Sequence, residues 1–449
     1  MDPTNAPIHN LTSCIAMRFS AIALLIAFSL TSCEKQNSPM QQEEAVQQAL
    51  DPELPATPFS YSTQAFPEEW LTDPALQLFG NIGSEIEVTD AGATLGRVLF
   101  YDPSMSADGT VSCSSCHVQA NAFSDSEARS VGVSGVPTVR NAMGLFNFRY
   151  QRRFFWDMRT VGLAQQVLEP IAHPDEMALS IEEMPERLLE QPYYAPLFEA
   201  AFGSEEINSD RVASALAQFL MCMRSYSSRY DAGRSNGFAN FSESERMGKD
   251  LFFNGETRCN QCHSGLNLFS TQPFVNGLEM DYAAAGDGGI GSISDDPYDD
   301  GRFKTVSLRN IGLTAPYMHD GRFATLHDVV DFYADDIQHH PYLDERLSVN
   351  GFGVPGQEPY QLSLSAEERS ALVDFLNDER TFFVNDDVCV FQPRPIVLVF
   401  GSLENLWPLV ETIRDSCEVL HFSDASRCRD MLSEHESVDF LLIEHEFAS

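Results

Sequence analysis

The sequence predicts a mainly α-helical chain of two similar halves, followed by a short α/β segment at the C-terminus. Three observations support this fold class. A C-x-x-C-H motif occurs twice, at 113–117 and at 259–263. Apolar residues at helical spacing precede and follow each copy. From about residue 395 the pattern changes to short apolar runs that alternate with helical segments, which is typical of a small parallel sheet.

The composition is that of a globular protein with a large acidic excess. Of the 449 residues, 43% are hydrophobic and 21% are charged, and a chain of this length predicts roughly two to four domains. Asp and Glu number 66 against 28 Lys and Arg, which gives a net charge of −38. This charge disfavours nucleic acids and anionic membrane surfaces as partners, because both require a basic face. The ten cysteines are too few and too unevenly placed for a disulfide scaffold.

The N-terminus has the pattern of an export signal. Met17-Arg18 opens a short positive region before an apolar run at 19–30. Met17 is also an alternative start of translation. This run is shorter than the roughly 20 residues of a membrane span and fits the core of a secretory signal. The small residues before Cys33 resemble a bacterial lipobox, and a plain signal with an incidental cysteine is the alternative. We therefore expect a periplasmic protein anchored to the outer membrane by a lipid on Cys33.

The two C-x-x-C-H motifs predict two covalently bound c-type haems. In each motif, two thiols three residues apart can add to the vinyl groups of one haem, and the next residue can place its imidazole under the iron. Export supports this interpretation, because c-type haem is attached outside the cytoplasm. The residues concerned are Cys113, Cys116 and His117 in the first motif and Cys259, Cys262 and His263 in the second.

A zinc site and a redox dithiol are the two competing interpretations of these motifs. Zinc would require the four cysteines to converge, and nothing in a zinc site requires a histidine after each pair. A thioredoxin-like pair would need a βαβ context, which neither motif has. Cys222 lies in a predicted helix and is expected to be a buried small hydrophobe.

Helices are predicted on both sides of each motif, as a small cytochrome c domain needs. The expected helices are 75–79, 91–100 and 210–224 around the first motif, and 242–253, 326–333 and 365–377 around the second. The segment 242–253 opens with a Ser and a Glu three residues later, which predicts a capping box. A glycine- and aspartate-rich stretch at 286–301 is predicted to be a loop.

These patterns divide the chain into five parts. The expected parts are a lipoprotein-type signal peptide (1–33), a flexible tether (34–74), a first cytochrome c-like domain (75–230), a second one (231–390) and a tail (395–449). The tail alternates strands at 396–400, 419–422 and 438–443 with two helices. This β-α-β-α-β order weakly resembles a truncated response-regulator receiver domain, but Glu444 stands where the phosphorylated aspartate would be. We expect no phosphotransfer, and the role of the tail is open.

Further sequence blocks resemble the bacterial di-haem cytochrome c peroxidases and the related MauG-like enzymes over roughly residues 75–385. The blocks are Arg140-Asn141-Ala142, Phe155-Trp156-Asp157, Leu308-Arg309-Asn310 and the run from Thr314 to Gly321. The resemblance implies that hydrogen peroxide meets the haem on His117. It also implies that the haem on His263 receives electrons from a small cytochrome c or copper protein, and that Trp156 is a catalytic residue. Members of the family are often homodimers.

The resemblance also predicts an axial ligand and a calcium ion. Peroxidases carry a methionine at the position of Tyr333, whereas MauG-like enzymes carry a tyrosine, whose hard oxygen favours ferric and higher iron states. Met318 is the fallback ligand, and a purely packing role for Tyr333 is the alternative. The calcium ligands of the family match the side chain of Asn141 and the carbonyls of Thr314 and Pro316, oxygen donors that suit this hard cation. Alternatively, Asn141 simply caps a turn.

The chain departs from the family beside the first haem. Where the family has a distal glutamine and a distal glutamate, this chain has Phe154 and Ala164. Where the family has a switching histidine, this chain has Val133. A carboxylate normally moves the proton that makes water the leaving group, and Glu169 is the candidate substitute. The sequence therefore leaves two functions open, a peroxidase or MauG-like oxidoreductase and a non-catalytic di-haem electron carrier or haem sensor. In either case the acidic charge predicts a basic donor protein whose binding weakens with salt.

Overall fold

The computed structural model describes most of the chain between residues 59 and 377. The described residues are 59–63, 66–73, 76, 86–349 and 358–377, together with the backbone of three later strands. Leu54–Arg394 forms one compact unit, and the segment from Pro395 onward belongs to another. The predicted signal peptide, Cys33 and most of the tether lie outside the described residues. Among the described helices, none has both the length and the apolar character that a membrane span requires.

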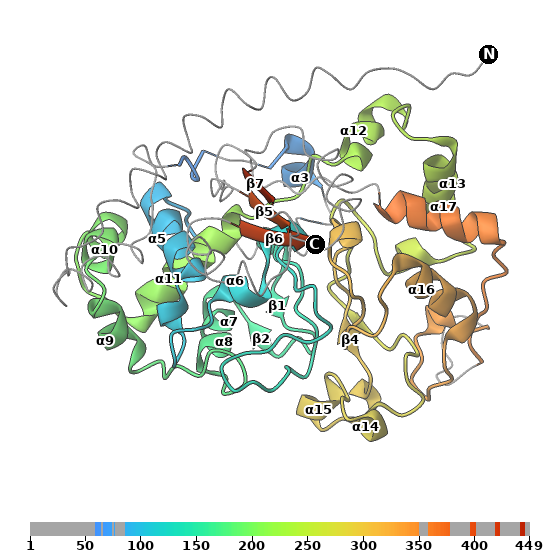
Figure 1. Cartoon of the computed structure of the whole chain (residues 1–449). Coiled ribbons are helices and arrows are strands. Elements are labelled where there is room, and N and C mark those ends of the chain that lie inside the picture. The colour runs from blue at the N-terminus through green and yellow to red at the C-terminus, as the bar shows by residue number, and fades with distance from the viewer. Residues whose placement is uncertain are drawn as a thin grey trace, which may run out of the picture. The chain divides into compact units, whose positions relative to one another are not determined.

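The first half of the large unit is built on two packed helices, α5 (Asp90–Tyr101) and α11 (Ser209–Cys222) (Figure 1). Thr89 and Asn208 cap their N-termini with side-chain oxygens, which satisfies backbone N–H groups that have no partner within the helix. The buried faces of α5 and α11 share one apolar core. Between them come α6 (Cys113–Cys116), β1 (Arg153–Phe154), β2 (Thr160–Val161), α7 (Leu163–Gln166), α8 (Leu168–Ala172), α9 (Met184–Leu189) and α10 (Tyr194–Phe202).

The second half repeats this plan with α13 (Glu243–Phe253) and α17 (Ala366–Asn377). The predicted capping box at the start of α13 is confirmed, because Ser242 and Glu245 each accept a hydrogen bond from the backbone of the other. One further helix, α3 (Glu68–Thr72), lies near the start of the unit. The other α-helices and strands of the second half are α12 (Arg229–Asn236), β3 (Pro273–Phe274), α14 (Tyr282–Ala285), α15 (Gly291–Ser294), β4 (Phe303–Lys304) and α16 (Leu326–Asp331).

A glycine in each half lets the paired helices approach closely. A Cβ atom on Gly96 of α5 would lie 1.9 Å from the carbonyl oxygen of Ala215 in α11. A Cβ atom on Gly248 of α13 would lie 1.8 Å from the carbonyl oxygen of Ala371 in α17. The same backbone contact thus fixes both helix pairs, which supports the prediction that the two halves are structural repeats.

We expect Gly248→Ala to destabilise the protein by about 1–3 kcal/mol or more, because the added methyl group meets backbone rather than a movable side chain. Chemical denaturation of the purified protein measures the effect. Gly255→Ala is the matched control, since nothing lies within 4 Å of its added Cβ. Equal stabilities of the two variants would contradict the proposed role of the helix contact.

Two predicted elements need correction. The stretch 286–301 is not wholly loop, because it contains α15 and a 3₁₀ turn at Pro297–Asp299. The helix predicted at 326–333 ends at Asp331 and continues as a π-helical turn, Phe332–Asp336. Helical periodicity does not reveal such a turn, because it adds only one residue locally. Most of the expected helix 75–79 lies outside the described residues.

The tail contains a three-stranded parallel sheet. Its strands β5 (Ile396–Phe400), β6 (Glu418–Phe422) and β7 (Leu441–Glu444) agree closely with the three expected strands. They pair in the order β6-β5-β7. The two expected helices of the tail lie outside the described residues, and nothing supports the receiver-like interpretation.

Candidate functional site

The first C-x-x-C-H motif places a half-buried imidazole directly after a single helical turn. Cys113 and Cys116 begin and end α6, which Ser112 caps. The Nδ1 atom of His117 lies 2.8 Å from the carbonyl oxygen of Phe123. A carbonyl only accepts, so Nδ1 carries the proton and Nε2 keeps its lone pair. Burial lowers the pKa of His117, which keeps the ring neutral, as a metal ligand must be.

The second motif repeats this arrangement. Cys259 opens a 3₁₀ turn, and the Nδ1 atom of His263 lies 3.3 Å from the carbonyl oxygen of Leu268. Burial lowers the pKa of His263 to about 4. Phe123 and Leu268, which supply the two carbonyl oxygens, both have a left-handed backbone. Each motif therefore presents a neutral imidazole with the same nitrogen fixed by the main chain.

The thiols do not behave like redox or zinc cysteines. Burial raises the pKa of Cys113 and of Cys262 to about 12, whereas the thiols of redox motifs have a lowered pKa. Within the described ranges, no group of three or more His, Cys, Asp or Glu side chains could hold a metal ion, so the cysteines do not converge on a zinc site. Cys222 is buried and its thiol contacts the Gln218 carbonyl, as predicted for a structural residue.

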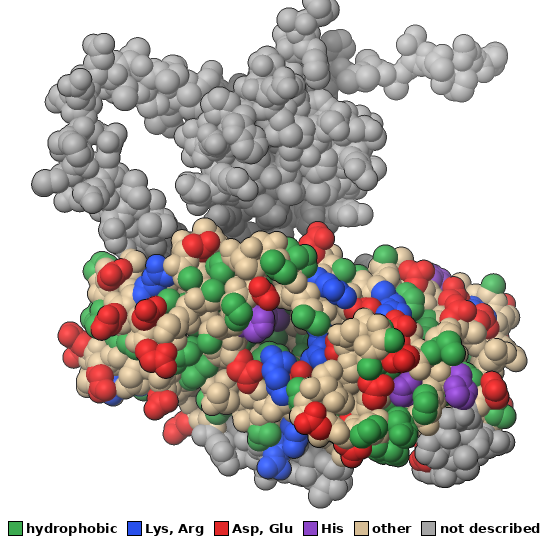
Figure 2. Space-filling view, turned by 90° about the horizontal axis from the view of Figure 1, so that it is seen from below, with side chains coloured by type: hydrophobic (Ala, Val, Ile, Leu, Met, Phe, Trp, Pro, Cys, Tyr) green, Lys and Arg blue, Asp and Glu red, His purple; other side chains and the backbone are tan. Residues whose placement is uncertain are grey.

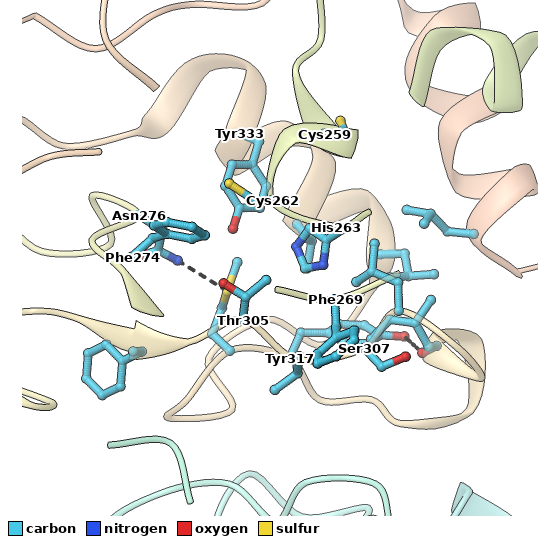
Figure 3. A pocket seen from close by; sticks show the side chains of 18 of the residues that line it. Cys259, Cys262, His263, Phe269, Phe274, Asn276, Thr305, Ser307, Tyr317 and Tyr333 are labelled. Atoms are coloured by element: carbon cyan, nitrogen blue, oxygen red, sulfur yellow. Dashed lines mark hydrogen bonds between the residues drawn. The ribbon is translucent and has the colours of Figure 1, made fainter. Parts of the chain in front are cut away.

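A large pocket of about 270 Å³ opens beside the second motif (Figure 3). Cys259, Cys262 and His263 line it together with Tyr333 and Met318. Tyr333 lies on the π-helical turn that follows α16, and its hydroxyl points into the pocket. Such turns frequently occur at functional sites. The structure thus brings together the second motif and both candidate axial ligands.

Trp156 connects the two halves. Its indole Nε1 donates to the carbonyl oxygen of Asn141 at 2.9 Å, and its own carbonyl accepts from the backbone N–H of Lys304 at 2.8 Å. The indole also lines the pocket of the second motif. Nearby, Arg140 of the first half forms a bidentate ion pair with Asp287 of the second, with both contacts at 2.7 Å.

The pocket residues fit a haem. The lining is largely apolar, with Leu326, Val330 and Leu372 among its residues. The buried ammonium of Lys304 donates to the Gln151 side chain at 2.6 Å and to a main-chain carbonyl at 2.9 Å, and both acceptors are uncharged. Burial lowers the pKa of Lys304 to about 7. A haem propionate would supply the negative charge that these acceptors lack.

The predicted acid–base residue of the first half is held in an ion pair. Glu169 accepts from Arg159 Nε at 2.9 Å and from the hydroxyl of Thr160. Phe154 is buried on β1, and Ala164 is exposed on α7. Arg159 and Thr160 therefore occupy both carboxylate oxygens of Glu169, which leaves neither one free to meet a bound peroxide.

Glu176 is a further carboxyl group that the sequence analysis missed. Burial is the main cause that raises the pKa of Cys113 and Cys116, and the negative charge of Glu176 adds to the rise in both, so Glu176 lies near the first motif. Burial raises the pKa of Glu176, and His173 Nδ1 lies 3.8 Å from its Oε1. Its backbone carbonyl accepts from the N–H of Val133, the position of the switching histidine. No spacing rule points to Glu176, because its nearness to the motif depends on tertiary packing.

The three predicted calcium ligands line the same pocket. Asn141 is buried, and its amide nitrogen lies 3.3 and 3.2 Å from the carbonyl oxygens of Glu127 and Ala128. Its backbone N–H donates to the His319 carbonyl, which follows the Thr314–Pro316 segment. The three residues therefore line one pocket, and the Asn141 amide also contacts the main chain of residues 127–128.

The fold and the two repeated motifs define a c-type cytochrome with two haem-binding halves. The family model described as "Di-haem cytochrome c peroxidase" matches residues 90–237. The methylamine utilization protein MauG of Methylorubrum extorquens is 34% identical over 292 residues, which are 64% of this chain and 78% of that protein. The cytochrome c551 peroxidase of Nitrosomonas europaea is 33% identical over 240 residues, or 53% and 71% of the two chains.

Among solved structures, a MauG-like protein associated with microbial copper homeostasis superposes with a TM-score of 0.57 at 32% sequence identity, covering 66% of this chain and 91% of that one. The chain belongs to the di-haem cytochrome c peroxidase and MauG family. The resemblance that the sequence blocks predicted is thereby confirmed.

Proposed function

We propose that this protein is an exported di-haem peroxidase, with its haem domains at 75–230 and 231–390. As a member of its family it is an oxidoreductase of the cytochrome c peroxidase type. The observation that carries the proposal is the pair of half-buried, neutral imidazoles, His117 and His263, each fixed through Nδ1 in one compact unit. When bound, haem supplies the redox chemistry needed to reduce peroxide to water or to drive a MauG-like oxidation.

The chain's own residues hold the cofactors and connect them. His117 and His263 are the proximal ligands, and the four motif cysteines attach the haems. Trp156 is the electron relay, because it contacts both halves and reaches the second pocket. Tyr333 would supply an oxygen ligand to the haem held by His263. A calcium ion at Asn141, Thr314 and Pro316 would stabilise the contact between the halves.

Reduction of peroxide to two waters consumes two protons, so a proton donor is needed beside the first haem. Glu169 was the candidate from the sequence, but Arg159 holds it in an ion pair. We favour Glu176, which is partly buried and lies near Cys113 and Cys116. Glu169 remains the alternative.

A small basic cytochrome c or copper protein is the proposed electron donor. Figure 2 shows Asp and Glu side chains over much of one face of the molecule, with Lys and Arg beside a hollow near its middle. A lipid on Cys33 would hold the enzyme at the outer membrane on the periplasmic side, within reach of such a donor.

A non-catalytic electron carrier or haem sensor is the competing function, and the exposed Ala164 at the distal glutamate position favours it. The test is to measure the intact mass, which should correspond to two covalent haems, and then to add stoichiometric hydrogen peroxide. A change in the haem absorption within seconds supports the peroxidase. An unchanged spectrum in protein that carries both haems would support the carrier or sensor instead.

Replacing Tyr333 with phenylalanine should change the electron paramagnetic resonance (EPR) signal of one haem and leave the other unchanged. The hydroxyl points into the pocket beside His263, so its loss removes an oxygen ligand from that haem alone. Tyr342→Phe, a nearby tyrosine outside the pocket lining, is the control. An unaltered spectrum for Tyr333→Phe would rule out this tyrosine as a ligand and leave Met318 as the candidate.

A further inference from the structure

The side chain of Asn276 lines the second pocket together with the two candidate axial ligands, Tyr333 and Met318, and Figure 3 labels it with Tyr333 in that pocket. Its amide nitrogen, Nδ2, is 3.8 Å from the sulfur of Met318. The same side chain interacts with the hydroxyl of Tyr333: burial raises the pKa of Tyr333 to about 12, and the Asn276 side chain acts against that rise. Asn276 comes two residues after strand β3, which pairs with β4 and is therefore fixed in the second half.

The orientation of this amide is fixed from behind. The amide oxygen of Asn276 accepts from the hydroxyl of Tyr282 at 3.0 Å and from the backbone N–H of Leu278 at 3.3 Å. Tyr282 is fully buried, so its ring cannot move aside easily. With the oxygen occupied by two donors, the NH₂ group faces the pocket. Both candidate ligands therefore meet a hydrogen-bond donor.

Met318 has a backbone conformation that few residues other than glycine adopt. Its φ angle is +75°, in the left-handed region. The contact with Asn276 Nδ2 is one of the interactions that hold its thioether beside Tyr333. A single residue thus contacts the phenol that would bind the iron and the thioether that would compete with it.

We propose that Asn276 is a positioning residue for the axial ligand of the second haem, directing the Tyr333 oxygen to the iron and holding the Met318 sulfur aside. The inference rests on the proposed ligation by Tyr333. A hydrogen bond to a ligating oxygen withdraws electron density from it, so Asn276 also sets how strongly that oxygen donates to iron. Loss of the N–H donor should therefore change this donation and shift the midpoint potential of that haem.

Two substitutions test the proposal on the full-length protein with both haems bound. Asn276→Asp keeps an oxygen for Tyr282 and Leu278 but replaces the NH₂ donor, and Asn276→Leu removes both functions. Each should shift both the EPR signal and the midpoint potential of the Tyr333-ligated haem, with the other haem unchanged. Asn208→Asp, at the N-cap of α11, makes the same chemical change and should shift neither haem.

A combined substitution separates positioning from a general structural effect. In a Tyr333→Phe background, Asn276→Leu should have a much smaller effect, because the ligand that Asn276 positions is gone. Shifts of equal size in both backgrounds would overturn the inference, as would silent Asn276 variants in protein where Tyr333→Phe itself changes the spectrum. If Tyr333→Phe is silent, the proposed ligation fails instead. If the Asn276 variants do not bind haem, Tyr282→Phe serves as the test instead, because it removes a donor that fixes the Asn276 amide. It should shift the EPR signal of the same haem, and an unchanged signal would overturn the inference.

Discussion

Replacing Glu176 with glutamine is expected to lower peroxide-dependent turnover by about 10²–10⁴-fold, the range in which general acid–base catalysis contributes. Burial raises the pKa of this carboxyl group, so more of it is protonated near neutral pH than of an ordinary glutamate. A proton donor must be protonated to act, so wild-type activity should fall as the pH rises through this raised pKa. Steady-state rates of a reduced donor and peroxide, measured against pH, check both expectations.

Glu169→Gln is the matched control for this experiment. Glu169 lies in the same segment and is about as exposed as Glu176, but Arg159 already holds it in an ion pair. Its substitution should therefore leave turnover within a few-fold of wild type. A large loss for Glu169→Gln together with normal turnover for Glu176→Gln would reverse the roles of the two residues. Haem content, measured by mass in each variant, separates loss of chemistry from loss of cofactor.

The contrast between these glutamates shows what sequence reasoning could and could not predict. The motifs, the flanking helices and the Ser242 capping box depend on residues a few positions apart, so local patterns predicted them. The burial of Glu176 near Cys113 and Cys116 depends on how distant segments pack. The sequence therefore indicated Glu169, which is closer along the chain to the missing distal glutamate at Ala164.

The second pocket likewise contains features that the sequence predicts and features that depend on tertiary packing. The resemblance to the family predicts Tyr333 as a ligand, but the π-helical turn that carries it follows a regular helix and has no sequence signal of its own. Asn276 went unnoticed because its contacts reach residues far along the chain, Met318 and Tyr333. The Leu308-Arg309-Asn310 block was recognised as a family signature without a physical reason for its arginine.

The structure supplies that reason, since Arg309 is fully buried and forms a bidentate ion pair with Asp231 of α12, with N–O distances of 2.8 and 2.7 Å. Its Nε donates to the Leu266 carbonyl, and its guanidinium lies 4.7 Å from the centre of the Trp70 ring. The pair thus ties three segments together: α3, α12 and the loop after the second motif.

Asp231→Asn should consequently cost about 3–5 kcal/mol in the free energy of unfolding, because it leaves the buried Arg309 charge without a counter-ion. Denaturant titration at neutral pH measures this loss. Glu69→Gln in α3 is the control, since it breaks the more exposed pair with Arg234, on the same helix as Asp231, and should cost less than about 1 kcal/mol. Similar losses for both variants would show that burial does not make the Asp231 pair special.

The pH dependence separates the charge of Asp231 from its shape. Burial alone would raise the pKa of Asp231, but hydrogen bonds from Arg309 and Ser228 outweigh it and hold the pKa below its usual value. A depressed pKa in the folded state means that the stabilisation is present above the unfolded-state pKa, about 3.9 for Asp, and is lost as the pH falls through the folded value. The stability gap between wild type and Asp231→Asn should therefore be constant near neutrality and close in acid. A gap that persists at low pH would mean that the lost geometry, and not the lost charge, destabilises the variant.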